Sequence, residues 1–391
     1  MARILIITQY FLPEITAAAY RLSALESYLT KQGHDVDVIT TFPHRSPNEQ
    51  AVNDTPKINR VSMPTIEGST KGRIKEQLWF MVRSFIAFIS KPGRYDYVIA
   101  TSPPLFAGLS GYFISKLCGG RFILDIRDIW PGSIIATGLF SSGSIPIRLA
   151  SFLERFLYHK AAHITTVAKP MATYVRQYKK NSDVSIVYNG VDELINTPVI
   201  GAPDSDFKHL NLVYAGNFGL VQGLDLLIRA VNSLEEKHKS QLKVSFLGQG
   251  FKQKELESLA AELGVSDRVS FAGPYTKSEL THILAEEAHA LFIHLKSDPS
   301  LNLTIPSKVF DCMQYNIPIV YGLSGEAHEI LNNHPGNISF RQDSVEDLKL
   351  ALEKLVNNYK VLHAASAANR TFVKDNFLRE ECFQPFLNII Y

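Results

Sequence analysis

Short apolar runs alternate with longer amphipathic stretches from one end of the chain to the other. Runs rich in β-branched residues predict strands at Ile4–Thr8, Val36–Thr41, Tyr97–Thr101, Phe122–Ile126, Ile164–Val167 and Ser185–Tyr188. Because these runs are apolar on both faces, we expect a parallel sheet with helices on both sides. The first helix is expected from about Thr16 to Gln32, and Gly33 is expected to end it in the left-handed conformation.

A second series of the same kind follows the polar stretch Asp192–Lys208. It predicts strands at Asn211–Ala215, Lys243–Leu247, Val269–Ala272, Ala290–Leu295 and Pro318–Tyr321. Helices are expected between them, at Gln253–Leu263, at Asp347–Asn357 and where Leu224, Leu227, Ile228, Val231 and Leu234 share one face. Alternation of strands and helices predicts two doubly wound α/β domains, with a boundary near residue 195.

The length and charge of the chain agree with two domains of ordinary size. A chain of 391 residues is too long for one compact core. Its 40 Lys and Arg residues against 38 Asp and Glu give a net charge of +2, which argues against a dedicated nucleic-acid binder. The cysteines, Cys118, Cys312 and Cys382, show neither zinc nor disulfide spacing, so we expect a reducing cytoplasm. We expect neither a signal peptide nor a membrane span, because the most apolar stretch, Leu78–Ile89, is interrupted by Arg83.

Two glycine-rich loops follow predicted strands of the second domain, where ligands of doubly wound sheets bind. In the stretch 215–224, Gly216, Gly219 and Gly223 would let the backbone approach a phosphate. Their spacing fits neither the dinucleotide fingerprint nor the P-loop, and a tight strand–helix turn explains it equally well. Gly248 and Gly250 form a second such loop, for which a simple turn is the stronger interpretation.

The segment Ser300–Met313 is the most informative. Pro306 suits the first turn of a helix, so Ser307 and Lys308 would lie beside its positive pole. A diphosphate there would meet backbone N–H groups, a hydroxyl and an ammonium, and Asp311 would reach ribose hydroxyls from the next turn. The alternative is a capped surface helix with an exposed lysine.

In the first domain, Asp125, Arg127 and Asp128 end a predicted strand, next to Trp130. Charged groups at that position are costly unless they are paired or face a ligand. A structural Arg–Asp ion pair is the alternative, and one acidic cluster beside an arginine is a poor metal site.

At these residues the sequence resembles the family 4 glycosyltransferases, which have the GT-B fold, in the bacterial branch that builds O-antigen and capsule and includes L-fucosamine transferase-like proteins. The resemblance rests on Tyr10–Ile15, Asp125–Pro131, Val187–Asp192, Gly216–Gly223 and Ile305–Asp311. It implies two Rossmann-like doubly wound domains that face a central cleft. Residues 1–195 would bind the acceptor, residues 196–371 would bind the sugar nucleotide, and residues 372–391 would form a helix that crosses back to the first domain.

The resemblance also implies a set of site residues. Arg127, Asp128 and Lys308 would be catalytic, with Arg127 in place of the family's histidine. Asn217 and Gln222 stand where many members carry an Arg/Lys pair on the diphosphate, which leaves Lys308 as the cation. Asp311 resembles the second of the family's paired acids, whereas Leu303 stands where the first acid would be. The donor would be bound by Thr16, Gly219, Gln222, Gly250, Pro274, Tyr275, Thr304, Ile305, Pro306, Ser307 and Asp311, with Pro274 and Tyr275 next to the base.

The activity that the resemblance implies is transfer, with retention, of a sugar from a UDP-sugar to a lipid-linked saccharide in O-antigen or capsule biosynthesis. N-acetyl-L-fucosamine or another N-acetylated sugar is the expected group, without a metal or other cofactor. Two alternatives stay open, a non-hydrolysing UDP-sugar epimerase and a non-catalytic protein that binds a sugar nucleotide for a partner.

The segment Lys71–Lys91 is basic at its start and aromatic after it. Such a helix can lie in an anionic membrane surface, where lipid-linked acceptors reside. We therefore expect a cytoplasmic protein in peripheral contact with the inner face of the cytoplasmic membrane. The alternative is a buried helix that covers the first sheet.

Overall fold

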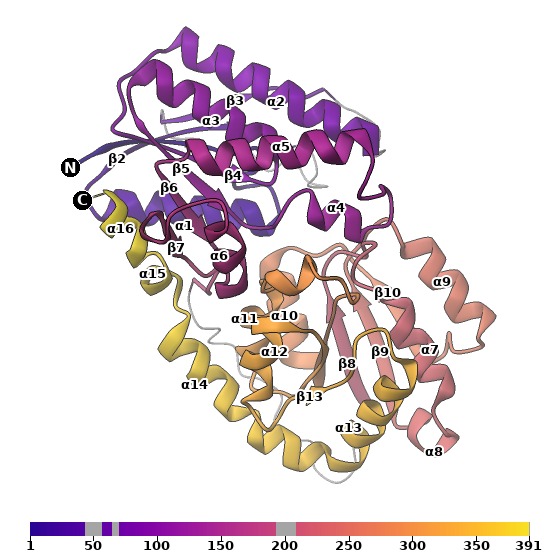
Figure 1. Ribbon diagram of the computed structural model, residues 1–391. Coiled ribbons are helices and arrows are strands. Elements are labelled where there is room, and N and C mark those ends of the chain that lie inside the picture. Colours follow the sequence, from indigo (N-terminus) through magenta and orange to yellow (C-terminus); the bar gives the residue numbers. More distant parts are fainter. Residues whose placement is uncertain (44–56, 65–69, 193–208, 391) are drawn as a thin grey trace. The chain divides into compact units, whose positions relative to one another are not determined.

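A computed structural model describes residues 1–43, 57–64, 70–192 and 209–390, without the side chains of Thr70, Lys71 and Arg73. The predicted boundary near residue 195 lies outside the described residues. The chain divides into two compact units (Figure 1): Met1–Asp192 with Arg379–Tyr391, and Glu193–Leu378. Each unit is a parallel sheet with helices packed on it, so the predicted class of two Rossmann-like α/β domains is confirmed.

The first sheet has the strand order β3-β2-β1-β4-β5-β6-β7, and its strands pair in parallel. The strands are β1 (Arg3–Ile7), β2 (Asp35–Thr41), β3 (Ile58–Val61), β4 (Tyr97–Ser102), β5 (Arg121–Ile126), β6 (His163–Thr166) and β7 (Val184–Ile186). The sequence pattern did not predict β3. That strand is a short edge strand whose burial is partial and whose centre is polar, Asn59 and Arg60, so it lacks the apolar run of a central strand.

Three helices form a layer on one face of the first sheet: α2 (Thr70–Ser90), α3 (Leu105–Cys118) and α5 (Ile145–Lys160). They lie side by side, with α3 in the middle. The chain just after helix α6 (Lys169–Arg176) lies next to α5, since the rings of Tyr158 and Tyr178 are 6.0 Å apart. The shorter elements of the unit are α4 (Gly132–Ala136) and η1 (Asn181–Asp183).

The other face is covered by α1 (Ala17–Lys31) and by the C-terminal segment. Helix α1 ends as predicted, with Gly33 in the left-handed region at φ 83°. The C-terminal segment, α15 (Arg379–Cys382) and α16 (Gln384–Ile390), contributes Phe383 and Phe386 to the core formed by β1, β2 and α1. The Tyr97 hydroxyl of β4 donates to the Ile390 carbonyl oxygen over 2.8 Å. Since Ile4 and Ile390 belong to the same core, the first strand and the last helix are packed together.

The second sheet has the order β10-β9-β8-β11-β12-β13, also with parallel pairing. Its strands are β8 (Leu210–Ala215), β9 (Leu242–Leu247), β10 (Val269–Ala272), β11 (Ala290–His294), β12 (Ile319–Gly322) and β13 (Ile338–Ser339). Helices α7 (Asp225–Ser233), α9 (Gln253–Glu262) and α13 (Val345–Ala365) share one core with it. The remaining elements are α8 (Glu236–Lys239), α10 (Lys277–Glu287), η2 (Leu301–Leu303), α11 (Lys308–Met313), α12 (Gly325–Asn332) and α14 (Ala367–Asn376).

Candidate functional site

The predicted donor residues of the second unit follow four adjacent strands. Gly219 and Gln222 follow β8, Gly250 follows β9, Pro274 and Tyr275 follow β10, and the segment from Thr304 to Asp311 follows β11. Since β10, β9, β8 and β11 are neighbours in a parallel sheet, their carboxyl ends lie along one edge. The strand order reverses between β8 and β11, which is where doubly wound sheets bind their ligands.

Lys308 and Gly216 meet at this point of reversal. A Cβ atom added at Gly216 would overlap the Lys308 ammonium, and Gly216 has a φ of 138°, which favours glycine. The ammonium donates to the Tyr214 hydroxyl over 2.5 Å and lies 3.8 Å from the centre of that ring. The hydroxyl in turn donates to the Asn217 carbonyl oxygen over 2.7 Å. Tyr214, which the sequence pattern marked only as a strand residue, therefore holds the lysine against the glycine loop.

Burial lowers the pKa of Lys308 to about 7, against the weak opposing effects of Cys312 and Asp311. The cause is loss of hydration, which disfavours the ammonium. A lysine kept in such an environment next to a glycine loop is suited to meet an anion, because the anion would restore the charged form.

Helix α11 differs from the predicted helix. It begins at Lys308 rather than at Pro306, with Ser307 as its N-cap residue, and it has six residues. The Ser307 side chain makes no capping hydrogen bond, although the turn is already helical there, since the Asp311 N–H donates to the Ser307 carbonyl oxygen. So short a helix has a weak dipole. The positive charge at this position comes mainly from the Lys308 side chain. Asp311 lies one turn after Lys308, on the same side of α11.

The side chains of Asn217 and Gln222 converge on Gly219. A Cβ atom at Gly219 would meet the Gln222 Oε1 and would lie 2.8 Å from the Asn217 Nδ2. Gln222 Oε1 is buried and has no hydrogen-bond partner among the described residues. The two positions at which the resemblance implies cations thus converge on one glycine, and both carry neutral amides.

His294, at the end of β11, fixes this loop and was not predicted. Its Nδ1 lies 2.8 Å from the Gln222 carbonyl oxygen, so the Nδ1–H tautomer donates to it. The Lys296 N–H donates to the Val221 carbonyl oxygen over 2.9 Å. Burial lowers the pKa of His294, which disfavours the protonated ring. The sequence feature that could have pointed to this role is the position of the histidine at the end of an apolar strand.

Gly250 has a packing role. A Cβ atom there would lie 2.5 Å from both the backbone nitrogen and the backbone oxygen of Phe218. The Phe218 N–H donates to the Gln249 carbonyl oxygen over 2.9 Å, so the loops after β8 and β9 are joined backbone to backbone. This contact supports the simple-turn interpretation of that glycine pair.

Pro274 and Tyr275 lead into α10. Thr276 and Glu279 form a capping box: the Glu279 carboxylate accepts from the Thr276 N–H over 2.8 Å, and the Thr276 hydroxyl accepts from the Glu279 N–H over 3.3 Å. The box fixes the entry of the chain into the helix, and with it the position of Tyr275. On the other side of the reversal point, Thr304 ends η2, Ile305 is buried, and Pro306 and Ser307 are half-buried.

In the first unit, Asp125 is part of a buried ion pair, and its partner is Arg21 of α1 rather than Arg127. Two nitrogens of Arg21 donate to the two carboxylate oxygens over 2.8 and 3.0 Å, and Thr165 donates over 2.7 Å. Although burial opposes the charge, the Arg21 guanidinium holds the pKa of Asp125 below its ordinary value. The structural ion pair considered above therefore accounts for Asp125.

Arg127 is held by the end of β4. Its Nε donates to the Thr101 hydroxyl over 2.6 Å, and its Nη2 donates to the Pro103 carbonyl oxygen. Burial lowers its pKa to about 10. Asp128 differs, because its Oδ1 is buried without a hydrogen-bond partner among the described residues, and burial raises its pKa to about 6. A carboxylate with a free acceptor atom at the carboxyl edge of the sheet is suited to bind a hydroxyl.

Thr16 is the N-cap of α1, where its hydroxyl accepts from the Ala19 N–H over 3.1 Å. This contact gives the residue a structural role in the first unit. Its predicted contact with a donor stays a prediction.

Two arginines hold the segment Val187–Asp192, one of the motifs that carried the resemblance. Arg21 donates to the Tyr188 carbonyl oxygen over 3.1 Å, and Arg379 donates to the carbonyl oxygens of Asn189 and Gly190 over 2.8 and 3.1 Å. Arg379 also pairs with Asp192. The sequence analysis did not single out either arginine, although Arg21 interrupts an apolar helical stripe.

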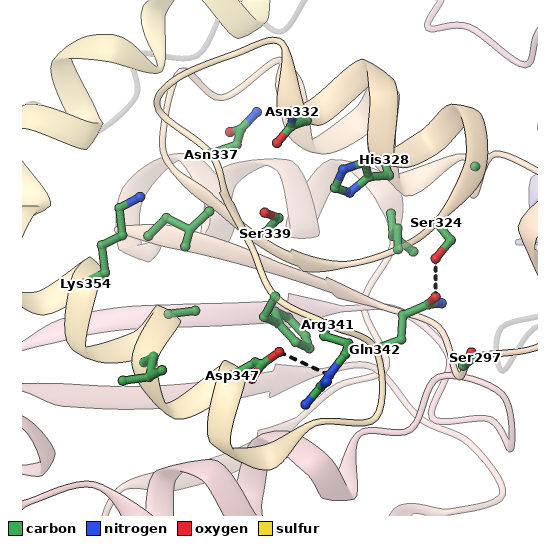
Figure 2. Close-up of a pocket in the computed structure, with 16 residues that line it drawn as sticks. Ser297, Ser324, His328, Asn332, Asn337, Ser339, Arg341, Gln342, Asp347 and Lys354 are labelled. Atoms are coloured by element: carbon green, nitrogen blue, oxygen red, sulfur yellow. Dashed lines mark hydrogen bonds and ion pairs between the residues drawn. The ribbon is translucent and has the colours of Figure 1, made fainter.

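A separate pocket of about 900 Å³ lies at the free edge of the second sheet, between α12, β13 and α13 (Figure 2). His328, Asn332 and Lys354 point into it, and Arg341 and Asp347 pair at its rim. None of the predicted donor-binding residues lines it. In the part of the chain that the structure describes, there is no group of three metal-ligating side chains, and no helix meets the length and apolarity that a bilayer span requires.

Comparisons with known proteins agree with this architecture. Residues 18–193 match the family model Glycosyltransferase Family 4, and residues 203–372 match the model Glycosyl transferases group 1. The chain is 23% identical to WcaI of Escherichia coli K12, a protein assigned to colanic acid biosynthesis as a glycosyl transferase, over 97% of this chain and 98% of WcaI.

Two solved structures show the same fold at low identity. WaaG, a glycosyltransferase involved in lipopolysaccharide biosynthesis, has a TM-score of 0.71 at 14% identity, over 98% of each chain. HepE of Anabaena, solved in complex with UDP-glucose, has a TM-score of 0.70 at 14% identity, over 99% of this chain and all of that one. With the Family 4 match on the first unit and the group 1 match on the second, the chain is a glycosyltransferase of the GT-B fold.

Proposed function

We propose that this glycosyltransferase moves a sugar from a UDP-sugar to a lipid-linked saccharide acceptor, with retention of configuration, in O-antigen or capsule biosynthesis. An N-acetylated sugar such as N-acetyl-L-fucosamine is the proposed group. The names of WcaI and WaaG, which place those proteins in bacterial polysaccharide biosynthesis, support the pathway class, and the UDP-glucose in HepE supports a UDP-sugar donor. The proposed location is the inner face of the cytoplasmic membrane.

The observation that carries the proposal is the position of the Lys308 ammonium over Gly216, at the point where the strand order reverses. The departing diphosphate would bind there, next to the ammonium and the backbone of the glycine loop. The bond from the anomeric carbon to the diphosphate then breaks through a cation-like transition state, and the charge that develops on the leaving oxygen is stabilised by the lysine. We assign the stabilisation of this charge to the Lys308 side chain, so the proposed reaction uses no metal or other cofactor.

The remaining predicted residues of the second unit would hold the rest of the donor. Gly219 and Gln222 would extend the diphosphate site, and Asp311 would accept hydrogen bonds from ribose hydroxyls. At Gly250 and at the buried Ile305 we propose that the backbone makes the donor contact, and Thr304, Pro306 and Ser307 would line the same site. Pro274 and Tyr275 would lie next to the base.

In the first unit we propose that Asp128 binds a hydroxyl of the transferred sugar through its unpartnered Oδ1. Because the Arg127 guanidinium is engaged by Thr101 and Pro103, Arg127 is proposed as a positioning residue that fixes the Asp128 loop. A departing phosphate oxygen takes the proton of the acceptor hydroxyl, so the reaction needs no separate strong base.

Replacement of Lys308 tests the proposal. The Lys308→Ala variant should lower turnover with the preferred UDP-sugar at least tenfold, which corresponds to about 1.4 kcal/mol of transition-state stabilisation. The donor is found first by thermal-shift screening against a panel of sugar nucleotides, since a bound donor raises the melting temperature. Lys360→Ala, on the exposed side of α13, is the matched control. Unchanged kinetics in Lys308→Ala would remove Lys308 from the mechanism.

The same assays separate the alternatives. Conversion of the UDP-sugar without any acceptor would indicate an epimerase, whereas donor binding without turnover on any lipid-linked acceptor would indicate a non-catalytic partner protein. The two family-model matches favour transfer.

A further inference from the structure

The outer layer of helices on the first sheet has an unusual surface. Helices α2 and α3 are joined by the hydroxyls of Ser84 and Ser110, 2.7 Å apart. Helices α3 and α5 are joined by the rings of Tyr112 and Phe156, whose centres are 5.3 Å apart. These contacts make one continuous layer, whose side away from the sheet we call the outer helical face (Figure 1).

This face is apolar. More than half of the large hydrophobic side chains that are exposed in the described chain lie on its three helices. They are Leu78, Trp79, Val82, Ile86 and Ile89 of α2, Phe113 and Leu117 of α3, and Ile145, Leu149 and Phe152 of α5. Helix α2 is therefore two-sided, because Phe80, Ser84 and Phe88 are buried while Val82 and Ile86 are half exposed. The buried side covers the sheet, as one interpretation of the sequence predicted, and the other side faces outward.

Helix α5, which the sequence analysis did not single out, is the most exposed of the three. Ile145 is 81% exposed, Leu149 58% and Phe152 65%, and their spacing places them on one side of the helix. Exposing so much apolar area costs free energy in water, and surfaces of this kind mark contact sites with proteins or membranes.

The exposed charges on the described residues of the three helices are of one sign. Their only acidic residues, Glu76 and Glu154, are 7% and 3% exposed. The exposed ionised side chains among the described residues of these helices are all cationic: Lys75, Lys116, Arg148, Arg155 and Lys160. Two of them flank the aromatic contact, since Lys116 lies 5.7 Å from the ring centre of Tyr112 and Lys160 lies 5.7 Å from that of Phe156.

The charge decides between two partners. A second copy of the chain would bring the same cationic surface, so two outer helical faces would repel each other. An anionic lipid bilayer offers both an apolar interior for Leu149 and Phe152 and negative headgroups for the cations. We propose that the outer helical face binds an anionic bilayer surface, with α5 and α3 inserting beside α2. This deepens the proposed function, in which the acceptor is lipid-linked.

Binding to vesicles that contain no acceptor tests the face by itself. The full-length protein should bind vesicles of phosphatidylcholine with about one-third phosphatidylglycerol at least tenfold more tightly than phosphatidylcholine alone. The preference should shrink between about 0.1 M and about 1 M salt, because salt screens the charges. The double variant Leu149→Asp/Phe152→Asp should bind anionic vesicles at least tenfold more weakly. Lys116→Glu/Arg148→Glu should lose the preference for anionic lipid.

The matched control is Leu350→Asp/Val361→Asp, which makes the same change at two exposed positions on α13 of the other unit and should bind like the unmodified protein. Equal binding by Leu149→Asp/Phe152→Asp and the unmodified protein would overturn the inference. So would a lipid-free dimer, seen by sedimentation, that the same variant dissociates. Transfer to a water-soluble acceptor analogue should be unchanged in these variants, so failure of the membrane surface and failure of the proposed activity give different results.

Discussion

Two ionisable side chains, Asp128 and Lys308, have pKa values that burial moves toward neutrality, to about 6 and about 7. If the proposed mechanism needs an ionised Asp128 and a charged Lys308, kcat/KM should rise as pH passes about 6 and fall above about 7. Because the bound diphosphate favours the ammonium, the alkaline limb of kcat should lie at higher pH than that of kcat/KM. Steady-state rates over a pH series measure both.

Lys308→Arg is the control for this profile, since a guanidinium keeps its charge to much higher pH. Residual activity of that variant should lack the alkaline limb. An unchanged alkaline limb in Lys308→Arg would assign it to another group.

Gly216 is expected to contribute to donor binding through the position of Lys308. In Gly216→Ala the new methyl group would displace the Lys308 ammonium from its position next to Tyr214, and we expect donor affinity to fall at least tenfold, or by about 1.4 kcal/mol. Isothermal titration with UDP measures the loss. Gly264→Ala is the control for loss of a glycine with positive φ away from the lysine, because Gly264 has a φ of 68° and a Cβ atom there would meet nothing within 4 Å. Similar losses in both variants would contradict the role of the lysine.

At the scale of elements, the Arg21–Asp125 pair joins α1 to β5 in the core of the first unit. Both side chains are almost fully buried, at 1% and 0% exposure. Replacing Arg21 by Met would leave the Asp125 carboxylate buried and unpaired, so the free energy of unfolding should fall by about 3–5 kcal/mol. Urea unfolding followed by circular dichroism measures it.

Lys31→Ala is the control, since the Lys31–Glu380 pair is 66% exposed on both sides and should contribute at most about 1 kcal/mol. If Arg21→Met unfolds at the same urea concentration as Lys31→Ala, the buried pair does not stabilise the unit.

At the scale of the whole molecule, the last residues complete the core of the first unit. Phe386 of α16 is fully buried among residues of β1, β2 and α1. Phe386→Ala should therefore cost about 3–5 kcal/mol, and the loss should appear in the unfolding of the first unit. Amide hydrogen exchange measures the protection of each unit separately. Phe251→Ala, at a position 76% exposed, should be nearly neutral. Weakened protection in the second unit alone would contradict this assignment.

The prediction of the fold rested on the pattern of apolar and polar residues along short segments of the chain. Apolar runs predicted strands in both sheets to within about two residues of their ends, because buried parallel strands are apolar on both faces. The pattern missed β3 and β13 for the same reason, since both are short edge strands of partial burial. The helix at Lys308 was predicted to start two residues early, because Pro306 marks the start of the turn and not of the regular helix.

The sequence by itself determined the α/β alternation, the glycine loops at strand ends and the presence of a lysine beside them, because each follows from residues close together in the chain. Only the tertiary structure decided which side chains pair with the site residues. Tyr214 and Lys308 are 94 positions apart, and Arg21 and Asp125 are 104 apart. Hydrogen bonding and loss of hydration depend on neighbours in space, so the pairing of Asp125 and the lowered pKa of Lys308 came from the fold and not from any local motif.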